Sequence, residues 1–467
     1  MKNLKIITIL LILAVLAGCQ NKEEKASATT IRGEILHPPS DSPLIIMKGA
    51  VRDTIGLDSS NHFSMTYHTK KPAYFQVKLR RQVYDLYLQP GDTITLRLDA
   101  SKNRNALEFI NGDTKASEYL LAYRDIRMHD ELFNTLLRND SLELFTLRNE
   151  YIRDSLNDLL ESYSDSIDDD DFFETEKQRI SYLLGNNQIT YNRYYRYIND
   201  TSLPDSVGFF AFLEEIPLEN PEMLKIQEYM QYLKSAFAFF NENTPTEKEE
   251  KDYLGDIKFN LRSIDDVIED DEVASALYYE MLMHYAEFQG FVGLDNEYAY
   301  MQKNLEDSAK LAEMERLHAF WDEIAPGKKA PGFAYPNPQG DSIALRDFEG
   351  KPIYIDVWAT WCGPCQHEIP YLESLYQDYK NTDIEIVSIS VDEKRKAWMN
   401  FIEEENPGWL QLHTGGWDCS LCADYHIAGI PRFLLIDRNG TIISTTAPLP
   451  SSDEIRPLFD KLLQDEI

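Results

Sequence analysis

The run IYIDVWATWCGPC, residues 353–365, decides the fold of the C-terminal part of this chain. It starts with the apolar and β-branched residues of a buried strand and ends with two cysteines that enclose a Gly-Pro pair. A helical pattern follows over residues 366–380, so the predicted order is strand, turn and helix. Cys362 is thereby predicted at the N-terminus of a helix, where free backbone N–H groups and the helix dipole stabilise negative charge.

The two cysteines of this run have the spacing that dithiol chemistry requires. A thiol at a helix N-terminus loses its proton more easily, and only the thiolate attacks a disulfide. The two intervening residues let Cys365 reach back and resolve the mixed disulfide that Cys362 forms. Pro364 falls in the first helical turn, where its missing N–H costs nothing. We therefore predict that Cys362 is the nucleophile and Cys365 the resolving cysteine.

Strands and helices alternate around this run. The composition of residues 325–332, APGKKAPG, is that of a linker, and it precedes an α/β domain predicted over residues 326–467. The expected strands cover residues 351–359, 384–391, 432–437 and 441–445, and the expected helices cover residues 366–380, 394–405 and 453–464.

This domain resembles thioredoxin, and in particular the TlpA/ResA-type thioredoxin-like oxidoreductases, because it combines the WCGPC motif with several of their landmarks. Pro370 matches the helix-kinking proline of that family. Ile430 and Pro431 match its cis-proline loop, which faces the cysteines and holds a bound substrate chain. Asp356 matches a buried acid below the resolving cysteine, where burial would raise its pKa and suit it to proton exchange with Cys365. Glu368 matches an active-site acid, with a surface glutamate as the alternative.

The same resemblance implies how substrates bind and what they are. Trp361, Gly363 and Pro364 would form the substrate-binding surface together with Ile430 and Pro431. The Gly-Pro pair and Ile430 are typical of a thioredoxin-like reductant, so the expected activity is reduction of protein disulfides. The resemblance implies disulfide-containing envelope proteins as partners, with apocytochrome c among the substrates, and a membrane electron donor of the thiol-reductase type. No cofactor is expected.

A second cysteine pair, Cys419 and Cys422, departs from the family pattern. It lies shortly before Pro431, on a helix or loop that is expected near the active site. A local disulfide that stiffens the segment is the favoured interpretation, and a pair that relays electrons is the alternative. A zinc site built from both pairs is disfavoured by the 53 residues between Cys365 and Cys419. His367 is interpreted as a solvated side chain, and no metal site is predicted.

The N-terminus predicts an exported, membrane-bound protein. Residues 1–18 combine two lysines with an apolar run over residues 6–16, as in a signal peptide, and this run is too short to span ~30 Å of hydrocarbon. The segment ends in Leu-Ala-Gly before Cys19, which resembles a bacterial lipobox and implies lipid on Cys19. An ordinary signal peptide with a chance cysteine is the alternative. Residues 19–29 are expected to form a tether, and a lysine followed by acids there leaves periplasm-facing and cell-surface locations open.

The remaining residues predict two further domains of a multidomain chain. Period-two alternation, as at residues 93–98, predicts an antiparallel β-sandwich over residues 30–114. It resembles an uncharacterised β-domain found at the start of many thioredoxin-like envelope lipoproteins. Residues 115–325 predict a central all-α region, with one apolar stripe over residues 144–160 and a helix that starts with Asn220 as N-cap before Pro221.

Composition excludes some classes of function. The 467 residues carry a formal charge of −33, which argues against nucleic-acid binding, and 43% hydrophobic residues exclude wholesale disorder. Two functions remain. The first is a thiol–disulfide oxidoreductase of the cell envelope. The second is a binding or adaptor lipoprotein in which the N-terminal domains recognise a partner and the thioredoxin domain is secondary.

Overall fold

The computed structural model consists of two compact units, Met1–Asn243 and Thr244–Ile467. The boundary between them lies inside the predicted helical domain of residues 115–325. The predicted signal segment and Cys19 lie outside the described residues. Among the described helices, none has both the length and the apolar character that crossing a membrane requires. The structure describes residues 26–38, 44–49, 51–79, 82–102, 106–129, 141–199, 201, 203, 208–243 and 253–464.

The N-terminal strands form two four-stranded sheets with the orders β4-β1-β7-β8 and β3-β2-β5-β6. One buried apolar cluster combines side chains of both sheets, including Ile31 and Leu96 from the first and Ile46, Phe75 and Val77 from the second. Alternating burial along β7 follows the period-two pattern of the sequence. The strands are β1 (Ser27–Leu36), β2 (Leu44–Lys48), β3 (Val51–Ile55), β4 (His62–Thr69), β5 (Ala73–Leu79), β6 (Gln82–Leu88), β7 (Thr93–Asp99) and β8 (Leu107–Asn111).

The expectation of a wholly antiparallel arrangement is wrong for one pair of strands. β1 runs parallel to β7, with Ile31 opposite Ile94, whereas β1 and β4 are antiparallel. Tight hairpin turns impose antiparallel pairing, but β1 and β7 are joined through five intervening strands. Side-chain alternation is the same in both kinds of pair, so the sequence pattern does not distinguish them.

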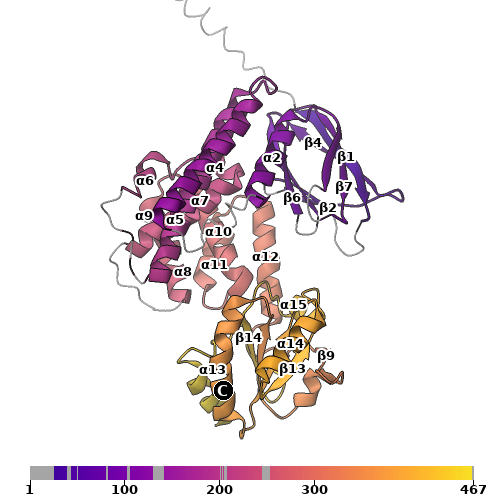
Figure 1. Ribbon diagram of the computed structural model, residues 1–467, viewed down its shortest axis with the longest axis vertical. Coiled ribbons are helices and arrows are strands. Elements are labelled where there is room, and N and C mark those ends of the chain that lie inside the picture. The colour runs from indigo at the N-terminus through magenta and orange to yellow at the C-terminus, as the bar shows by residue number, and fades with distance from the viewer. Residues whose placement is uncertain are drawn as a thin grey trace, which may run out of the picture. The chain divides into compact units, whose positions relative to one another are not determined.

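Helices cover one side of this β structure. Tyr87 of β6 packs with Tyr119 of α2, Phe145 of α4 and Phe172 of α5 in one buried cluster. Figure 1 shows α2 between the strands and the longer helices α4 and α5. The helical elements of this unit are α2 (Lys115–His129), α4 (Leu142–Ser162), α5 (Asp170–Asn199), α6 (Phe212–Glu215), the 3₁₀ helix Pro221–Lys225 and α7 (Gln227–Asn243).

Two expectations about these helices are corrected. The buried stripe of α4 consists of Phe145, Ile152, Leu156 and Leu160, and Leu147 of the expected stripe is 57% exposed. The second correction concerns Asn220, which precedes a 3₁₀ helix and makes no capping bond. Its side-chain amide instead donates to Gln178 and Tyr182, so a tertiary contact replaces the predicted cap.

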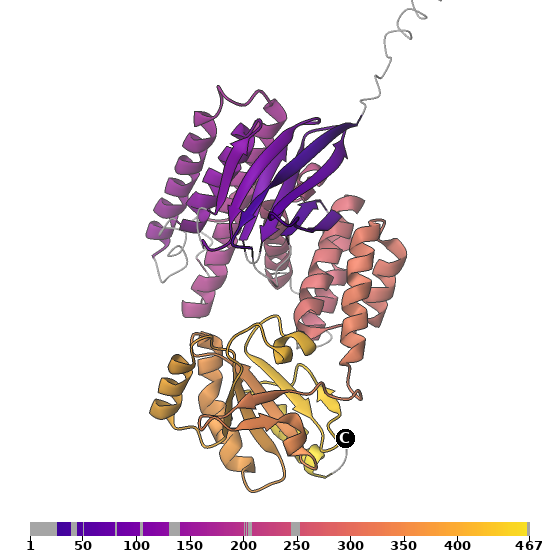
Figure 2. The ribbon, with the colours of Figure 1, turned by 90° about the vertical axis from the view of Figure 1, so that its right-hand side faces the viewer.

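The second unit begins with the helices α8 (Tyr253–Arg262), α9 (Ile264–Val267), α10 (Asp271–Gln289), α11 (Asp295–Asn304) and α12 (Ser308–Glu323). Asp270 caps α10 and Asp307 caps α12 through side-chain bonds to backbone N–H groups. Figure 2 shows α10, α11 and α12 side by side.

The C-terminal domain is built on a five-stranded sheet with the order β13-β12-β11-β14-β15. Side chains of α13 and α16 share one buried cluster with Tyr354 of β11 and Phe433 of β14, so both helices pack on the same face. Figure 1 shows α13 alongside the strands. The elements are β9 (Ala334–Pro336), β10 (Ser342–Ala344), β11 (Ile353–Trp358), α13 (Gly363–Tyr379), β12 (Glu385–Ser390), α14 (Arg395–Glu405), β13 (Leu410–His413), α15 (Ser420–Asp424), β14 (Arg432–Ile436), β15 (Ile442–Ser444) and α16 (Ile455–Leu463).

Candidate active site

Cys362 and Cys365 are joined as a disulfide at the start of α13, and their Cα atoms are 5.3 Å apart. Cys362 is the N-cap residue of this helix, and its Sγ accepts the backbone N–H of Cys365 at 3.2 Å. Pro364 lies in the first turn, as predicted. This position places the Cys362 sulfur among the unpaired N–H groups of a 17-residue helix, which stabilise a thiolate there.

A buried carboxylate holds the turn that carries the cysteines. Asp392 accepts the backbone N–H of Thr360 at 3.0 Å and the Thr360 hydroxyl at 2.8 Å. The Ser390 hydroxyl donates to the same carboxylate at 2.8 Å. Thr360 is two residues before Cys362, so these bonds tie the redox turn to the end of β12. Asp392 was not predicted as a site residue, because one acid after a strand carries no motif of its own.

Asp356 lies on β11 and is buried, with 5% of its surface exposed. Burial raises the pKa of its carboxyl group to about 7, and the charge of Glu368 acts in the same direction. The Ser388 hydroxyl opposes this effect, because it donates to Asp356 Oδ2 at 2.7 Å. The Trp409 indole N–H in turn donates to Ser388 Oγ at 2.8 Å. Neither Ser388 nor Trp409 carries a signal that a single sequence could reveal.

A cavity of about 270 Å³ adjoins Asp356. Ser388, Trp358 and Trp409 line its inner part, while Glu405 and Asn406 belong to its lining and are exposed. The lining of this cavity thus includes both a buried carboxyl group and exposed residues, and no cysteine.

Glu368 is buried rather than a surface residue of α13. Its carboxylate accepts the backbone N–H of Ser451 at 3.0 Å and the Ser451 hydroxyl at 2.9 Å. Glu368 also follows Cys365 by three residues on the same helix, which makes the two side chains neighbours on one helical face. The structure thus gives Glu368 a binding partner in the segment before α16 and a position close to the cysteines.

The predicted substrate-binding residues lie around the same turn. Trp361 is 64% exposed and Gly363 and Pro364 are exposed, whereas Cys362 is only 5% exposed. Ile430 and Pro431 are joined by a cis peptide bond and are partly exposed. Arg432 pairs with Val357 in the sheet, which brings Pro431 beside the end of β11 from which the cysteine turn departs. These five residues therefore frame the disulfide at one edge of the sheet.

The second pair, Cys419 and Cys422, is present as two free thiols, so the local disulfide favoured from the sequence is not formed in the structure. Cys419 is the N-cap residue of α15, and its Sγ accepts the backbone N–H of Cys422 at 3.5 Å. A hydrogen bond with the Cys422 thiol is the main cause that lowers the pKa of Cys419 to about 6, and hydrogen bonds with Tyr335 and Thr414 add to it. The same thiol–thiol bond, together with burial, raises the pKa of Cys422.

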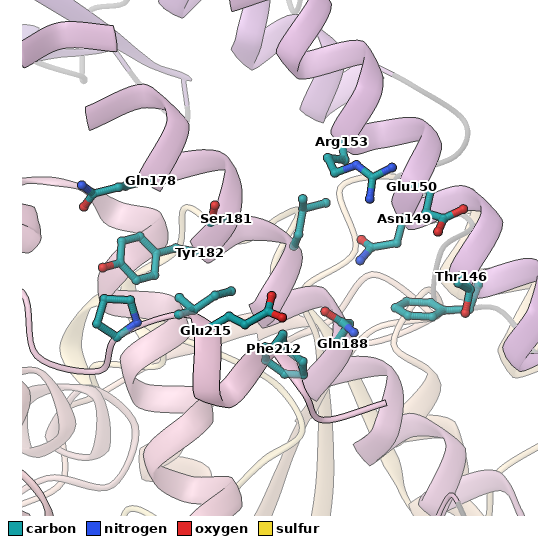
Figure 3. Close-up of a pocket in the computed structure, with 14 residues that line it drawn as sticks. Thr146, Asn149, Glu150, Arg153, Gln178, Ser181, Tyr182, Gln188, Phe212 and Glu215 are labelled. Carbon is teal, nitrogen blue, oxygen red and sulfur yellow. The ribbon is translucent and has the colours of Figure 1, made fainter. Parts of the chain in front are cut away.

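A second cavity, of about 510 Å³, lies in the N-terminal unit between α4, α5 and residues 212–217. Figure 3 shows Asn149, Glu150 and Arg153 on one side of it and Gln178 and Tyr182 on the other. No cysteine lines this cavity, so it has no thiol with which to exchange disulfides. It is therefore not a candidate for the redox chemistry.

Comparisons with known proteins concern the C-terminal part of the chain. Residues 325–456 match the Redoxin family. The chain is 31% identical over 142 residues to the thiol-disulfide oxidoreductase ResA of Bacillus thuringiensis subsp. konkukian, which covers 30% of this chain and 80% of that relative. ResA of Bacillus subtilis is 31% identical over 123 residues, covering 26% of this chain and 67% of that relative.

A solved structure is similar over the same region. The thioredoxin domain of a thiol-disulfide oxidoreductase from Bacteroides vulgatus is 28% identical, with a TM-score of 0.28, and the match covers 30% of this chain and 99% of that chain. Since 31% identity extends over 80% of a ResA protein, this chain is an enzyme of the ResA-like thiol-disulfide oxidoreductases, with a redoxin domain at its C-terminal end.

Proposed function

We propose that this oxidoreductase reduces disulfides of envelope proteins through Cys362 and Cys365, while a lipid on Cys19 holds it at a membrane. The observation that carries the proposal is the position of the Cys362 sulfur, which caps α13 and accepts the N–H of Cys365 at 3.2 Å. A thiolate formed there is stabilised by the helix N-terminus and is ready to attack a disulfide.

The reaction proceeds in two exchange steps. The Cys362 thiolate attacks a substrate disulfide, one substrate sulfur leaves as a thiolate, and a mixed disulfide forms. The Asp356 carboxylate, whose pKa of about 7 suits it to proton transfer near neutrality, takes the proton from Cys365. The Cys365 thiolate then attacks Cys362 Sγ, which releases the second substrate thiol and closes the Cys362–Cys365 disulfide. Glu368 adds negative charge near Asp356 and helps keep its pKa high.

The substrate contacts the exposed residues that frame the disulfide. Trp361 offers a large apolar surface beside a Gly363 whose missing side chain leaves open space above the cysteine turn. We assign Pro364, Ile430 and Pro431 to the same contact surface, since they lie exposed or partly exposed at this edge of the sheet. An extended substrate segment would thus reach Cys362 without any rearrangement of the sheet.

The biological setting follows the family and the N-terminal sequence. We propose that residues 1–18 are removed, that residues 19–29 tether the protein, and that residues 30–114, 115–325 and 326–467 act as three domains. Substrates are disulfide-containing envelope proteins, with apocytochrome c as one candidate, and a membrane electron donor of the thiol-reductase type restores the dithiol. The Gly-Pro pair between the cysteines supports reduction as the direction.

Insulin reduction by the full chain tests the redox part of this proposal. In dithiothreitol, the wild type should precipitate insulin chains much faster than the reductant alone does. Cys362→Ser should not exceed the rate of the reductant alone. Cys19→Ser is the matched control, because it removes a cysteine remote from the motif and should keep full activity. Equal inactivity of wild type and Cys362→Ser would contradict the proposal and favour a binding protein.

Substrate capture tests the biological part. In a variant with Cys365→Ser, Cys419→Ser and Cys422→Ser, no second thiol of the C-terminal domain can resolve a mixed disulfide, so mixed disulfides between Cys362 and natural substrates should accumulate in envelope extracts and be released by reductant. Adding Cys362→Ser to this variant should abolish the capture. Detergent partitioning of the wild type against Cys19→Ser tests the anchor, and loss of the wild type to the aqueous phase would refute it.

A further inference from the structure

The second cysteine pair reproduces the local geometry of the first. In both pairs the first cysteine is the extended residue before a helix, and its Sγ accepts the backbone N–H of the second cysteine, at 3.2 Å for Cys362 and 3.5 Å for Cys419. The first pair has this arrangement with its disulfide closed. Cys419 and Cys422 therefore share the helix position and the hydrogen-bond pattern of a pair that forms a disulfide.

The surroundings divide the two thiols into different roles. Cys419 is partly exposed, whereas Cys422 is buried with 7% exposed surface. Tyr335 lies against Cys419, and its hydroxyl also accepts the backbone N–H of Leu421 at 2.9 Å. These contacts stabilise negative charge on Cys419 and leave Cys422 as the covered partner, which is the division between an attacking and a resolving cysteine.

The sheet places both pairs at one edge. Strands β11, β12 and β13 are parallel and adjacent, and the two cysteine turns follow the carboxyl ends of β11 and β13. Two strand spacings separate these ends, which corresponds to about 10 Å. The rings of Trp361 and Trp417, one beside each pair, have centroids 6.5 Å apart.

Both turns are also fastened to the same short segment. Thr360 binds Asp392, and Thr414 donates its backbone N–H to Ser390 O at 2.9 Å. Ser390 and Asp392 are themselves joined by a side-chain hydrogen bond of 2.8 Å. The loop that carries Cys362 and the loop that leads to Cys419 therefore have a common anchor.

We propose that Cys419 and Cys422 are a second redox couple that exchanges disulfides with the Cys362–Cys365 couple of the same chain. The Cys419 thiolate attacks Cys362 Sγ, the bond between Cys362 and Cys365 breaks, and Cys365 leaves as a thiolate that takes up a proton. Cys422 then loses its proton and attacks Cys419 Sγ, so that Cys362 is released as a thiolate. Two electrons pass from one couple to the other, and no outside oxidant or reductant is consumed.

The second step becomes easier once the first has occurred. The pKa of Cys422 is raised first by its hydrogen bond with Cys419, then by burial and by the negative charge on Cys419. A Cys419 sulfur that is bonded to Cys362 is no longer a thiolate, so its charge and its strongest acceptor character are gone. The chain can thus hold a second pair of electrons beside the substrate site, a role that rests on the proposed function.

A cross-link between the two attacking cysteines tests whether the couples meet. In the full chain with Cys365→Ser and Cys422→Ser, exposure to oxidised glutathione should produce a Cys362–Cys419 disulfide, detected in peptides by non-reducing mass spectrometry. The matched control, Cys365→Ser with Cys419→Ser, leaves buried Cys422 and should give ~10-fold less cross-link. Absence of the Cys362–Cys419 peptide in the folded first variant would overturn the exchange.

A titration tests whether the second pair is a redox couple by itself. In Cys362→Ser with Cys365→Ser, the alkylation of Cys419 and Cys422 should change from both to neither as the ratio of oxidised to reduced glutathione rises. Thiols at every ratio, a disulfide at every ratio, or stoichiometric zinc on the wild type would each overturn the proposal. Neither measurement uses substrate turnover, so they can fail or succeed independently of insulin reduction.

Discussion

At the scale of single residues, the surroundings of Asp356 set its chemistry. The carboxyl group is buried, receives a single side-chain hydrogen bond from Ser388 among the bonds described, and lies in the field of Glu368. Burial and a neighbouring negative charge both disfavour the ionised form, and they outweigh the hydrogen bond that favours it. The result is an acid whose pKa of about 7 allows it to accept and release a proton at neutral pH.

Replacement of Asp356 should remove a step from the pH profile of turnover. In the wild type, insulin reduction should rise with pH through about 7, because only the ionised carboxylate accepts the proton of Cys365. Asp356→Asn should lose this rise and fall ~100-fold in rate above pH 7, as expected when a general base is removed. Stopped-flow rates of the single-turnover reaction between pH 5.5 and pH 9 would measure it.

Ser388→Ala is the matched variant for this experiment. It removes the hydrogen bond that lowers the pKa of Asp356, so the inflection should move to higher pH while the maximal rate is retained. A profile in Asp356→Asn that still follows the wild-type curve would show that another group governs the proton transfer.

The same carboxyl group should also affect stability in a pH-dependent way. Its folded pKa is raised from 3.8 to about 7, so the folded state holds this proton more tightly than the unfolded state does. The stabilisation is complete below pH 4 and is lost as the pH rises to 7. Asp356→Asn should therefore be more stable than the wild type at pH 8, by up to about 4 kcal/mol, and not at pH 4. Urea unfolding at both pH values checks this, and an equal effect at both would contradict it.

At the scale of elements, the redox turn depends on contacts with the neighbouring strand. The turn between β11 and α13 is held by Asp392, which follows β12 and accepts two bonds from Thr360. The segment before α16 is held by Glu368 of α13 through Ser451. Each carboxylate therefore joins two elements that are distant in sequence, and neither was recognisable as an anchor from its neighbours in the chain.

Loss of the Asp392 carboxylate should loosen the redox turn. Asp392→Ala leaves the N–H and hydroxyl of Thr360 without their acceptor and should lower the free energy of unfolding by about 2–4 kcal/mol. Insulin reduction should fall as well, because Cys362 lies two residues beyond Thr360. Asp392→Asn keeps one carbonyl acceptor and should lose less stability and less activity than Asp392→Ala. Stability equal to wild type in Asp392→Ala would mean that the anchor is not needed.

At the scale of the whole molecule, the N-terminal unit is joined internally by a buried charge cluster. Arg179 of α5 lies 3.3 Å from Glu176 and 3.8 Å from Glu228 of α7. Tyr74 of β5 donates to Glu176 at 2.7 Å, so the cluster connects the strands with the helices. Burial raises the pKa of Glu176 to about 7, although Arg179 opposes this rise.

Removal of the positive charge should destabilise this unit. Arg179→Met keeps most of the apolar stem but leaves buried Glu176 without its cation, while Glu228 keeps its ion pair with Arg127, and the change should cost about 3–5 kcal/mol. Adding Glu176→Gln removes one of the acids and should restore part of the loss. Thermal unfolding would measure the loss of stability, and limited proteolysis would show whether the destabilised part is residues 26–243.

Insulin reduction supplies the control for this variant. Every residue of the proposed redox site belongs to Thr244–Ile467, so activity below the first unfolding transition should match the wild type. A double variant no more stable than Arg179→Met would contradict the role given to the charge pair.

The local sequence was sufficient to predict the features that depend only on neighbouring residues, such as the redox motif and the alternation of strands. The order strand, turn and helix around residues 353–365 is confirmed, since β11 ends at Trp358 and α13 begins at Gly363. A cysteine spacing and a proline in the first turn act over a few residues, so they can be recognised in one sequence. The alternation predicted at residues 93–98 agrees with β7 for the same reason, because alternation is a property of the strand itself.

Tertiary structure alone decided the features that join distant residues. The parallel pairing of β1 with β7, the use of Asn220 as a tertiary donor, and the bonds of Asp356 to Ser388 all depend on where separate segments meet. By itself, therefore, the sequence determined which residues can do redox chemistry, and the packing of the chain determined which groups adjust their protons, since a pKa depends on burial and neighbouring charge rather than on order along the chain.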